Sequence, residues 1–182
     1  MDNNTNNAVP YIETERLRLR KFKIEDSAEY LKYHNIKESL TFYDWKPDTL
    51  ADAQQDIRLM ISDYDEMSRI QWAITNKENN TLIGDCGVLI DTFGLKGEIN
   101  YILSKDYWGL GLMAEALNSV ISYCFNETKI LRIQALTRPD NDSSSRLLKR
   151  LGFSLEGLLS KYGYSLVTNQ PVDLNMWSLL KD

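Results

Sequence analysis

The sequence predicts an α+β fold, in which four helices flank one mixed and mostly antiparallel sheet of about seven strands. Some segments alternate polar and apolar residues, as Arg16–Arg20 does, and this is typical of half-buried strands. Other segments repeat apolar residues every three or four positions, which is typical of amphipathic helices. The predicted order is a strand, two helices, three strands, a helix, a strand, a helix and two strands. This order favours helices and strands packed around a single sheet.

Length and composition indicate one domain over residues 1–182, with 1–10 loosely ordered. The chain has 182 residues, of which 43% are hydrophobic, so it can bury a substantial core. Cys86 and Cys124 lie far apart in apolar contexts. That placement is typical of reduced, buried thiols in a cytoplasmic protein rather than of a disulfide or a metal site.

The charge and the hydropathy pattern restrict the partners. A net charge of −5 argues against nucleic acid, whose binding depends on clustered Lys and Arg, and is easier to reconcile with a neutral or cationic substrate. No segment resembles a secretory signal or is long enough to span a bilayer. We therefore expect a soluble cytoplasmic protein with no nucleic-acid or membrane partner.

The first part of the chain contains a strand and two helices. The strand is Arg16–Arg20, and helical signals follow over Ile24–His34. A capping box over Thr49–Asp52 opens the second helix, whose apolar face should comprise Ala53, Ile57, Met60, Ile61 and Tyr64. An aromatic segment between the helices either lines a pocket or covers the core; it contains Phe42, Tyr43, Trp45 and Pro47.

Three strands and a long helix follow. The strands are Ile70–Thr75, Leu82–Ile90 and Glu98–Leu103, and the turn-rich segment Asn76–Asn80 predicts that the first two form an antiparallel hairpin. The helix carries one apolar stripe, which should pack on the sheet and which comprises Met113, Leu117, Val120, Ile121, Cys124 and Phe125.

The last elements are two strands that follow a strand and a helix. We predict a strand over Leu131–Thr137 and a helix over Asp142–Leu151, closed by Gly152 at a position that favours left-handed backbone. The final strands are Ser154–Leu159 and Val172–Leu180.

A glycine-bearing turn between a strand and a helix is the most informative segment. Residues 107–117 read YWGLGLMAEAL, so the turn runs directly into the amphipathic helix. Backbone N–H groups at a helix start lack intrahelical partners and lie at the positive end of the helix dipole, so they can hold a pyrophosphate. Glycines let the backbone approach such a ligand closely.

The turn has two other interpretations. Gly109, Gly111 and Ala114 fit the dinucleotide-binding pattern G-x-G-x-x-G/A. That pattern needs the first glycine at the end of a strand and an acidic residue at the end of the next strand, whereas here Ser104–Trp108 intervene and the next strand ends at Thr137. A nicotinamide cofactor is therefore disfavoured. The turn can also be a loop that needs glycine only for its geometry.

Further motifs resemble, in their order along the chain, those of the GNAT acetyltransferase superfamily. They are EINYIL at 98–103, YWGLG at 107–111, NDSSSRLLKRLGF at 141–153 and EG at 156–157. ETERLRLR at 13–20, VD at 172–173 and WSLL at 177–180 extend the resemblance to nearly the whole chain. Within the superfamily the chain is most similar to the ribosomal-protein N-terminal acetyltransferases of the RimJ and RimL type. The resemblance implies the GNAT fold and an acetyl-CoA-dependent N-acetyltransferase.

The resemblance also implies which residues hold acetyl-CoA. The pantetheine arm would run beside the strand end at Ile102 and Leu103, Asn141 would hydrogen-bond this arm, and Ser144 would lie near the sulfur. The pyrophosphate would be held by the backbone amides of Trp108, Gly109, Leu110, Gly111, Leu112 and Met113.

Two departures from the family pattern affect this site. Met113 stands where Gly or Ala is usual, and Leu110 stands where a basic residue is frequent. We expect reduced affinity for CoA rather than its loss, because backbone amides supply most of the contact.

Transfer to an amine requires a proton acceptor, because only the neutral amine attacks a thioester. Glu98 is the first candidate; it shares a strand face with Asn100, and the alternative is a solvated carboxylate at the strand end. Tyr101, on the opposite face, either lines the acceptor site or belongs to the core. Tyr43 is a further candidate for the acceptor site. Tyr162, expected like Tyr164 in the loop before the last strand, either closes the acceptor site or belongs to the core.

The leaving thiolate requires a hydrogen-bond donor. Many members of the superfamily use a tyrosine seven residues after the asparagine, where this chain has Leu148. In the branch that the chain resembles, the serine of Asn-x-x-Ser has that role, and Ser144 matches it as a donor to the developing charge. The alternative is an ordinary serine in the first turn of a helix. His34, the only histidine, is expected at the surface or in packing rather than as a base, and Tyr164 either closes the acceptor site or belongs to the core.

We therefore expect acetyl transfer from acetyl-CoA to a primary amine by direct attack in a ternary complex. A protein N-terminus, a polyamine, an amino sugar and an amino acid all remain open as acceptors. A CoA-binding module without turnover is the alternative of another class, suggested by Leu110, Met113 and Leu148. A helix-rich edge and a late exposed strand are compatible with a homodimer.

Overall fold

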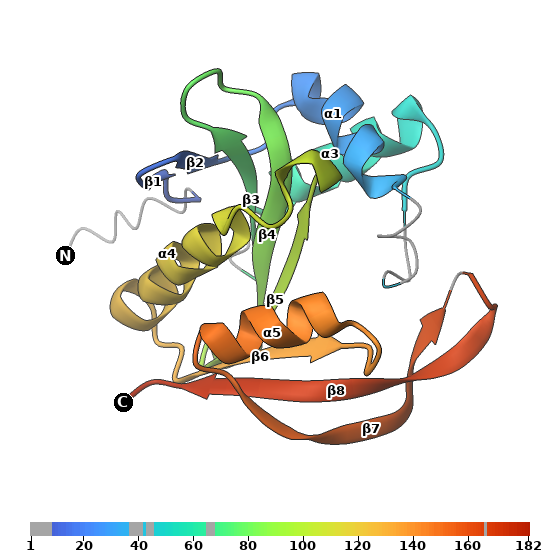
Figure 1. Cartoon of the computed structure of the whole chain (residues 1–182). Coiled ribbons are helices and arrows are strands. Elements are labelled where there is room, and N and C mark those ends of the chain that lie inside the picture. Colours follow the sequence, from blue (N-terminus) through green and yellow to red (C-terminus); the bar gives the residue numbers. More distant parts are fainter. Residues whose placement is uncertain (1–8, 37–41, 43–45, 65–67, 166) are drawn as a thin grey trace.

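A computed structural model describes residues 9–36, 42, 46–64, 68–165 and 167–182. In this part of the chain an eight-stranded sheet has the order β1-β2-β3-β4-β5-β6-β8-β7, and four α-helices pack against it (Figure 1). The helices are α1 (Ser27–His34), α3 (Leu50–Asp63), α4 (Leu112–Glu127) and α5 (Asp142–Arg150). The strands are β1 (Ile12–Glu13), β2 (Leu17–Arg20), β3 (Arg69–Asn76), β4 (Leu82–Ile90), β5 (Lys96–Leu103), β6 (Arg132–Thr137), β7 (Ser154–Ser165) and β8 (Gln170–Leu180).

The predicted fold class and element order are confirmed, with the two-residue β1 as the additional strand. The predicted hairpin is β3 and β4, which pair antiparallel from Arg69 and Leu89 to Thr75 and Leu82. The capping box also forms: the Thr49 hydroxyl accepts the N–H of Asp52 at 3.2 Å.

One pair of neighbouring strands separates, and this positions the site. β5 and β6 are parallel and pair only over Lys96–Glu98 and Arg132–Gln134. Beyond Glu98, β5 stays paired with β4 as far as Leu103, while β6 follows β8 as far as Thr137. The strands β3 to β5 therefore diverge from β6 to β8 (Figure 1). Backbone groups on the far half of β5 face this gap instead of a neighbouring strand.

The helices cover opposite faces of the sheet because strand side chains alternate between the faces. α4 and α5 pack on one face, over a core that includes Trp72, Ile99 and Leu103. α1 and α3 cover the other face, over a smaller core that includes Ala73 and Ile102. Cys86 and Cys124 are free, buried thiols, as predicted.

Two sequence predictions need correction. Ile61, placed on the apolar face of its helix, is 38% exposed, because the face of α3 that packs on the sheet carries Ala53, Ile57 and Met60. Tyr162 and Tyr164 lie within β7, which continues to Ser165, rather than in a loop before the last strand.

Some predictions concern residues outside the described part of the chain. Tyr43 and most of 1–10 belong to this group. Among the described residues, no helix has the length and apolarity to cross a membrane, and no cluster of acidic, Cys or His side chains could hold a metal ion.

Candidate active site

Two adjoining cavities open at the gap between β5 and β6. The first has a volume of about 460 Å³ and lies between the end of β5, the glycine turn, the start of α4 and α5. The second, of about 250 Å³, lies between β5, the end of β6 and the strands β7 and β8. Four residues line both, namely Phe42, Tyr101, Asn141 and Ser144. A ligand group at the inner end of one cavity would therefore meet a ligand in the other.

The glycine turn presents backbone donors to the first cavity. Gly109 and Gly111 have φ angles of 75° and 76°, a region that residues with a Cβ rarely adopt. Gly111 is the N-cap of α4 and supplies no side chain to cap it. Among the described residues, nothing accepts the N–H groups of 109–114, since the first bond of the helix is donated by Glu115 to Gly111. The turn therefore leaves these N–H groups available to an anion.

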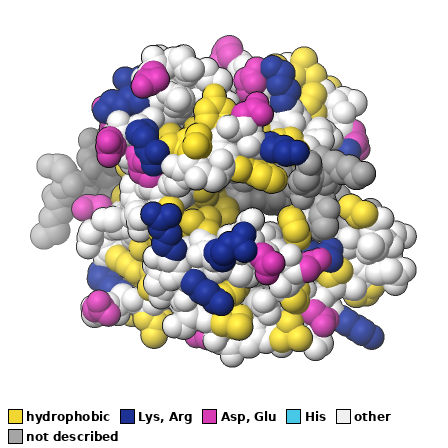
Figure 2. Space-filling view, viewed as in Figure 1, with side chains coloured by type: hydrophobic (Ala, Val, Ile, Leu, Met, Phe, Trp, Pro, Cys, Tyr) yellow, Lys and Arg dark blue, Asp and Glu magenta, His cyan; other side chains and the backbone are white. Residues whose placement is uncertain are grey.

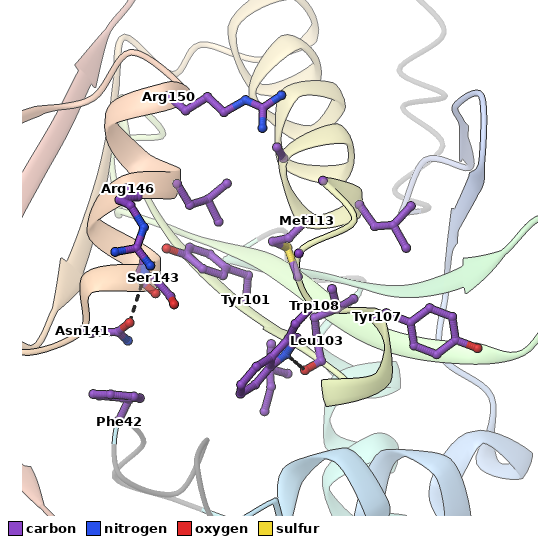
Figure 3. A pocket seen from close by; sticks show the side chains of 17 residues that line it. Phe42, Tyr101, Leu103, Tyr107, Trp108, Met113, Asn141, Ser143, Arg146 and Arg150 are labelled. Atoms are coloured by element: carbon purple, nitrogen blue, oxygen red, sulfur yellow. Dashed lines mark hydrogen bonds between the residues drawn. The ribbon is translucent and has the colours of Figure 1, made fainter.

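Trp108 differs from the rest of this set. Its backbone N–H donates to the carbonyl of Lys105 at 3.1 Å, so this amide is already engaged within the turn. Its indole N–H donates to the carbonyl of Leu103 at 2.7 Å, which joins the turn to the end of β5 (Figure 3). Trp108 thus contributes the shape of the turn, while the amides after it remain available.

An ion pair from the N-terminal strand region holds the turn from outside. Arg16 Nε donates to Glu115 Oε2 at 2.7 Å, and Arg16 Nη1 donates to the carbonyl of Leu110 at 3.0 Å. The Thr14 hydroxyl donates to Glu115 Oε1 at 2.6 Å. Burial alone would raise the pKa of Glu115, but these hydrogen bonds outweigh it and lower the pKa below its ordinary value. The charged carboxylate therefore fixes the position of the turn.

The start of α5 brings the predicted asparagine and serine to the junction of the cavities. Asn141 is the N-cap, and its side-chain oxygen accepts the N–H of Ser144 at 3.0 Å (Figure 3). Its NH₂ group is thus directed away from the helix backbone. Burial raises the pKa of Tyr101 to about 12, and a hydrogen bond with Ser144 opposes part of this rise. Tyr101 is a neutral phenol at physiological pH, in contact with the serine that the resemblance placed near the sulfur.

Positive charge borders the first cavity in an otherwise acidic protein. Arg146 and Arg150, one helical turn apart on α5, both line it, and Asp and Glu are absent from its lining among the described residues. Figure 2 shows basic side chains over α5 beside the hollow in this face of the molecule. The cavity suits an anionic ligand, although the net charge of the chain is −5.

The second cavity places an acid at the point where the strands separate. Glu98 faces Gln134 in the last rung between β5 and β6, and the Gln134 amide donates to Glu98 Oε2 at 2.6 Å. Asn100 and Arg138 line the same cavity, and Arg138 is paired with Asp140 at 3.1 Å. Glu98 can accept a hydrogen bond from an ammonium group. Asn100 and Arg138 can donate hydrogen bonds to a polar atom next to that ammonium group.

The remaining candidate residues are placed as follows. Ile102, Leu103, Leu112 and Met113 line the first cavity, and Met113 is also buried in the core. Leu110 lines neither cavity: its side chain is 56% exposed and only its carbonyl is held. Tyr162 is 62% exposed and lines neither cavity, whereas Tyr164 lines the second. His34 is buried in packing, as one of the predicted alternatives had it.

Sequence reasoning missed two kinds of contributor. Arg146 and Arg150 have a readable signal, because a spacing of four residues places both on one helix face beside the predicted cofactor site. The pairing of Arg16 with Glu115 joins residues 99 positions apart, so no local sequence pattern predicts it.

Comparisons with known proteins show the family of this chain. Residues 16–154 match the family described as "Acetyltransferase (GNAT) domain". The chain belongs to the GNAT family of acetyltransferases. A Bacillus licheniformis protein, named uncharacterized N-acetyltransferase p20, is 35% identical over 170 residues, which cover 92% of this chain and 94% of that protein. This GNAT protein is therefore an acetyl-CoA-dependent N-acetyltransferase.

Other similarities concern acetyltransferases of ribosomal proteins. The Escherichia coli [ribosomal protein uS5]-alanine N-acetyltransferase is 41% identical over 64 residues, which cover 35% of this GNAT chain and 33% of that protein. A solved structure of RimL, a ribosomal L7/L12 α-N-protein acetyltransferase in complex with coenzyme A, has a TM-score of 0.87 at 20% identity, covering 95% of this chain and 99% of that one. At that identity the structure shows a shared fold.

Proposed function

We propose that the first cavity binds acetyl-CoA and that the second binds a primary amine, with acetyl transfer at their junction. The observation that carries this proposal is that Tyr101, Asn141 and Ser144 line both cavities. An acetyl thioester that reaches this junction along β5 lies beside an amine in the second cavity. The enzyme then acts mainly by holding the two reactants together.

The chemistry needs one proton acceptor and one hydrogen-bond donor. The neutral amine nitrogen forms a bond to the acetyl carbon, the carbon–sulfur bond breaks, and the sulfur leaves as a thiolate that is later protonated. Glu98, directly or through a water, takes the proton that the ammonium form of the amine must lose. The Ser144 hydroxyl donates to the developing charge on sulfur.

The cofactor's phosphates match the donors that the chain leaves available. Backbone N–H groups of 109–113 are placed to hold the pyrophosphate, and Asn141 to hydrogen-bond the pantetheine arm. Arg146 and Arg150 supply the positive charge that a basic residue at the position of Leu110 would otherwise provide. Arginine suits this role because its planar fork of donors fits phosphate oxygens.

We infer that the natural amine is the α-amine of a protein or peptide N-terminus. The name of the E. coli relative specifies N-acetylation of an alanine of ribosomal protein uS5, and the match covers 33% of that relative. Polyamines, amino sugars and free amino acids are the competing acceptors. A screen that measures free thiol release, with peptides bearing free N-termini alongside small amines, distinguishes them.

The role of Ser144 is tested by Ser144→Ala. We expect kcat to fall by about 10- to 100-fold, while the Kd for acetyl-CoA stays within about twofold. Ser145→Ala is the matched control, because Ser145 lies in the same turn and lines neither cavity. A Ser144→Ala enzyme with wild-type kcat at saturating substrates would exclude the assigned role.

The role of Glu98 is tested by Glu98→Gln across pH. The variant should lose most activity at pH 6 to 7, where the amine is protonated, and approach the wild-type rate as pH rises towards the pKa of the amine. A constant ratio of variant to wild-type rate over this range would assign the proton transfer elsewhere.

A further inference from the structure

A buried carboxylate lies on the face of the sheet covered by α1 and α3, the face that also carries Asn100 of the second cavity. Asp85, on β4, is only 3% exposed. The Tyr33 hydroxyl donates to Asp85 Oδ2 at 2.6 Å, and the Gln71 amide nitrogen donates to Asp85 Oδ1 at 2.6 Å. Burial and the charge of Asp85 raise the pKa of Tyr33 well above its ordinary value, so Tyr33 stays protonated and donates. His34 Nε2 also lies 3.3 Å from Asp85 Oδ2. Asp85 therefore acts as an acceptor towards Tyr33 and Gln71.

This carboxylate fixes which way the Gln71 amide points. A carboxylate that accepts can pair with the NH₂ group of Gln71 but not with its carbonyl. Gln71 is 2% exposed, and its carbonyl oxygen is buried without a hydrogen-bond partner among the described residues. An unpaired buried carbonyl is costly. The orientation persists because reversing the amide would turn its carbonyl oxygen towards the Asp85 carboxylate.

A glycine allows Gln71 to reach Asn100, which lines the cavity. Gln71, Gly87 and Asn100 face one another in register across β3, β4 and β5. A Cβ at Gly87 would lie 1.9 Å from the carbonyl oxygen of Gln71. With glycine there, the Gln71 amide passes over the middle strand, and its nitrogen also donates to Asn100 Oδ1 at 3.0 Å.

The same logic then orients Asn100. Its carbonyl oxygen is held by Gln71, so its NH₂ group is the part of the amide left for the second cavity, which Asn100 lines as an exposed residue. Glu98 lies on the same strand face, two residues away. The cavity thus presents a hydrogen-bond acceptor and, beside it, a donor whose direction is set by Gln71 on the same face of the sheet.

We propose that Asn100 selects acceptors by donating a hydrogen bond to a carbonyl oxygen adjacent to the reacting amine, and that Gln71 is the positioning residue that enforces this direction. This inference rests on the proposed function. Amines of peptides and amino-acid amides carry such an oxygen, whereas alkylamines do not. Asn100 is exposed, so its NH₂ group donates to water when an alkylamine is bound, and the preference for an amine with the oxygen equals the net contribution of one hydrogen bond.

The test compares alaninamide with isopropylamine, which has a methyl group in place of the carboxamide. Rates of thiol release give kcat/KM for each amine, corrected for the fraction of each that is unprotonated. We expect the wild-type enzyme to prefer alaninamide by about tenfold. Equal values of kcat/KM would overturn the inference alone, whereas no thiol release with either amine would overturn the proposed function as well.

Asn100→Asp isolates the donor. The aspartate still accepts from Gln71 but presents an oxygen to the cavity, so the preference should fall from about tenfold to about twofold or less. Asn118→Asp, at an exposed position of α4, is the matched control and should retain the full preference. Retention of the preference by Asn100→Asp would overturn the assignment of Asn100.

Gln71→Met tests the positioning role, because methionine fills a similar volume without an amide. Asn100 is then free to rotate, and the preference should fall to about threefold, with the Kd for acetyl-CoA unchanged. An unchanged preference in a variant that binds acetyl-CoA normally would show that Gln71 acts in folding alone.

Discussion

The two cavities are built in different ways, although four residues line both. The first is lined by consecutive residues of the glycine turn and the start of α4, by the end of β5 and by one face of α5. The second depends on side chains from strands far apart in sequence, oriented by the buried residues Gln71 and Asp85. Main-chain donors remain when their own side chains are replaced, whereas an oriented amide is lost with its side chain.

This difference predicts different effects for substitutions at the two cavities. Changes around the glycine turn and α5 should alter the affinity for acetyl-CoA with every acceptor alike. Changes to Gln71 or Asn100 should alter which amine is used and leave the affinity for acetyl-CoA unchanged.

Removal of both arginines beside the first cavity should have the largest effect on binding. Arg146→Ala with Arg150→Ala should raise the Kd for acetyl-CoA by about 30- to 100-fold, because charge-assisted hydrogen bonds contribute roughly 1.5–3 kcal/mol each and solvent reduces this at exposed positions. Calorimetric titration measures it. Lys149→Ala is the control, since Lys149 lies on the same helix outside the cavity lining. A double variant within threefold of wild type would refute the phosphate role.

A side chain at the N-cap of α4 should weaken binding through the backbone. Gly111→Ala places an L-residue at φ 76°, which costs roughly 1–2 kcal/mol, so the Kd for acetyl-CoA should rise by about tenfold as the turn relaxes. Gly94→Ala imposes similar strain at φ 71° in a distant turn. That control should lower the melting temperature without changing the affinity, and an equal loss of affinity in both variants would argue against a local effect.

Loss of the charge at Glu115 should loosen the turn from outside. Glu115→Gln should reduce the free energy of unfolding by about 1 kcal/mol and raise the Kd for acetyl-CoA a few-fold, because the amide cannot accept every bond from Thr14 and Arg16. The native pKa of Glu115 lies below its ordinary value of 4.5, so this stabilisation is present above pH 4.5 and is lost as pH falls through the native pKa. Denaturant unfolding at pH 7 and pH 3 should show a smaller difference between variant and wild type at pH 3.

The smallest expected effect concerns stability on the acceptor side. Burial raises the pKa of Asp56, on α3, from 3.8 to about 6. Its folded pKa exceeds the unfolded value, so the native state is destabilised progressively between pH 3.8 and 6 and fully above that range. Asp56→Asn should therefore stabilise the protein at pH 7 by roughly 1 kcal/mol or less after solvent screening. The gain should vanish near pH 3, and an equal gain at both pH values would assign it to another cause.

The contrast between the cavities also explains how much the sequence could predict. The fold class, the hairpin and the available amides of the glycine turn follow from local periodicity and from the chemistry of helix starts, and the motif order predicted the family. Gln71, Gly87 and Asn100 become one unit only through the register of three strands, which no local pattern specifies. The residues after Leu159 show no clear alternation, so the sequence predicts a loop at Tyr162. In the structure β7 continues through Tyr162 to Ser165.

The account depends most on acetyl-CoA being held by the main chain of one turn, and amide NMR tests this directly. Saturating acetyl-CoA should shift the backbone N–H signals of Gly109, Gly111, Leu112 and Met113 strongly. The N–H of Trp108, already bonded within the turn, should shift little. If those four signals stay in place while acetyl-CoA binds and shifts residues of the second cavity instead, the assignment of the two cavities is contradicted.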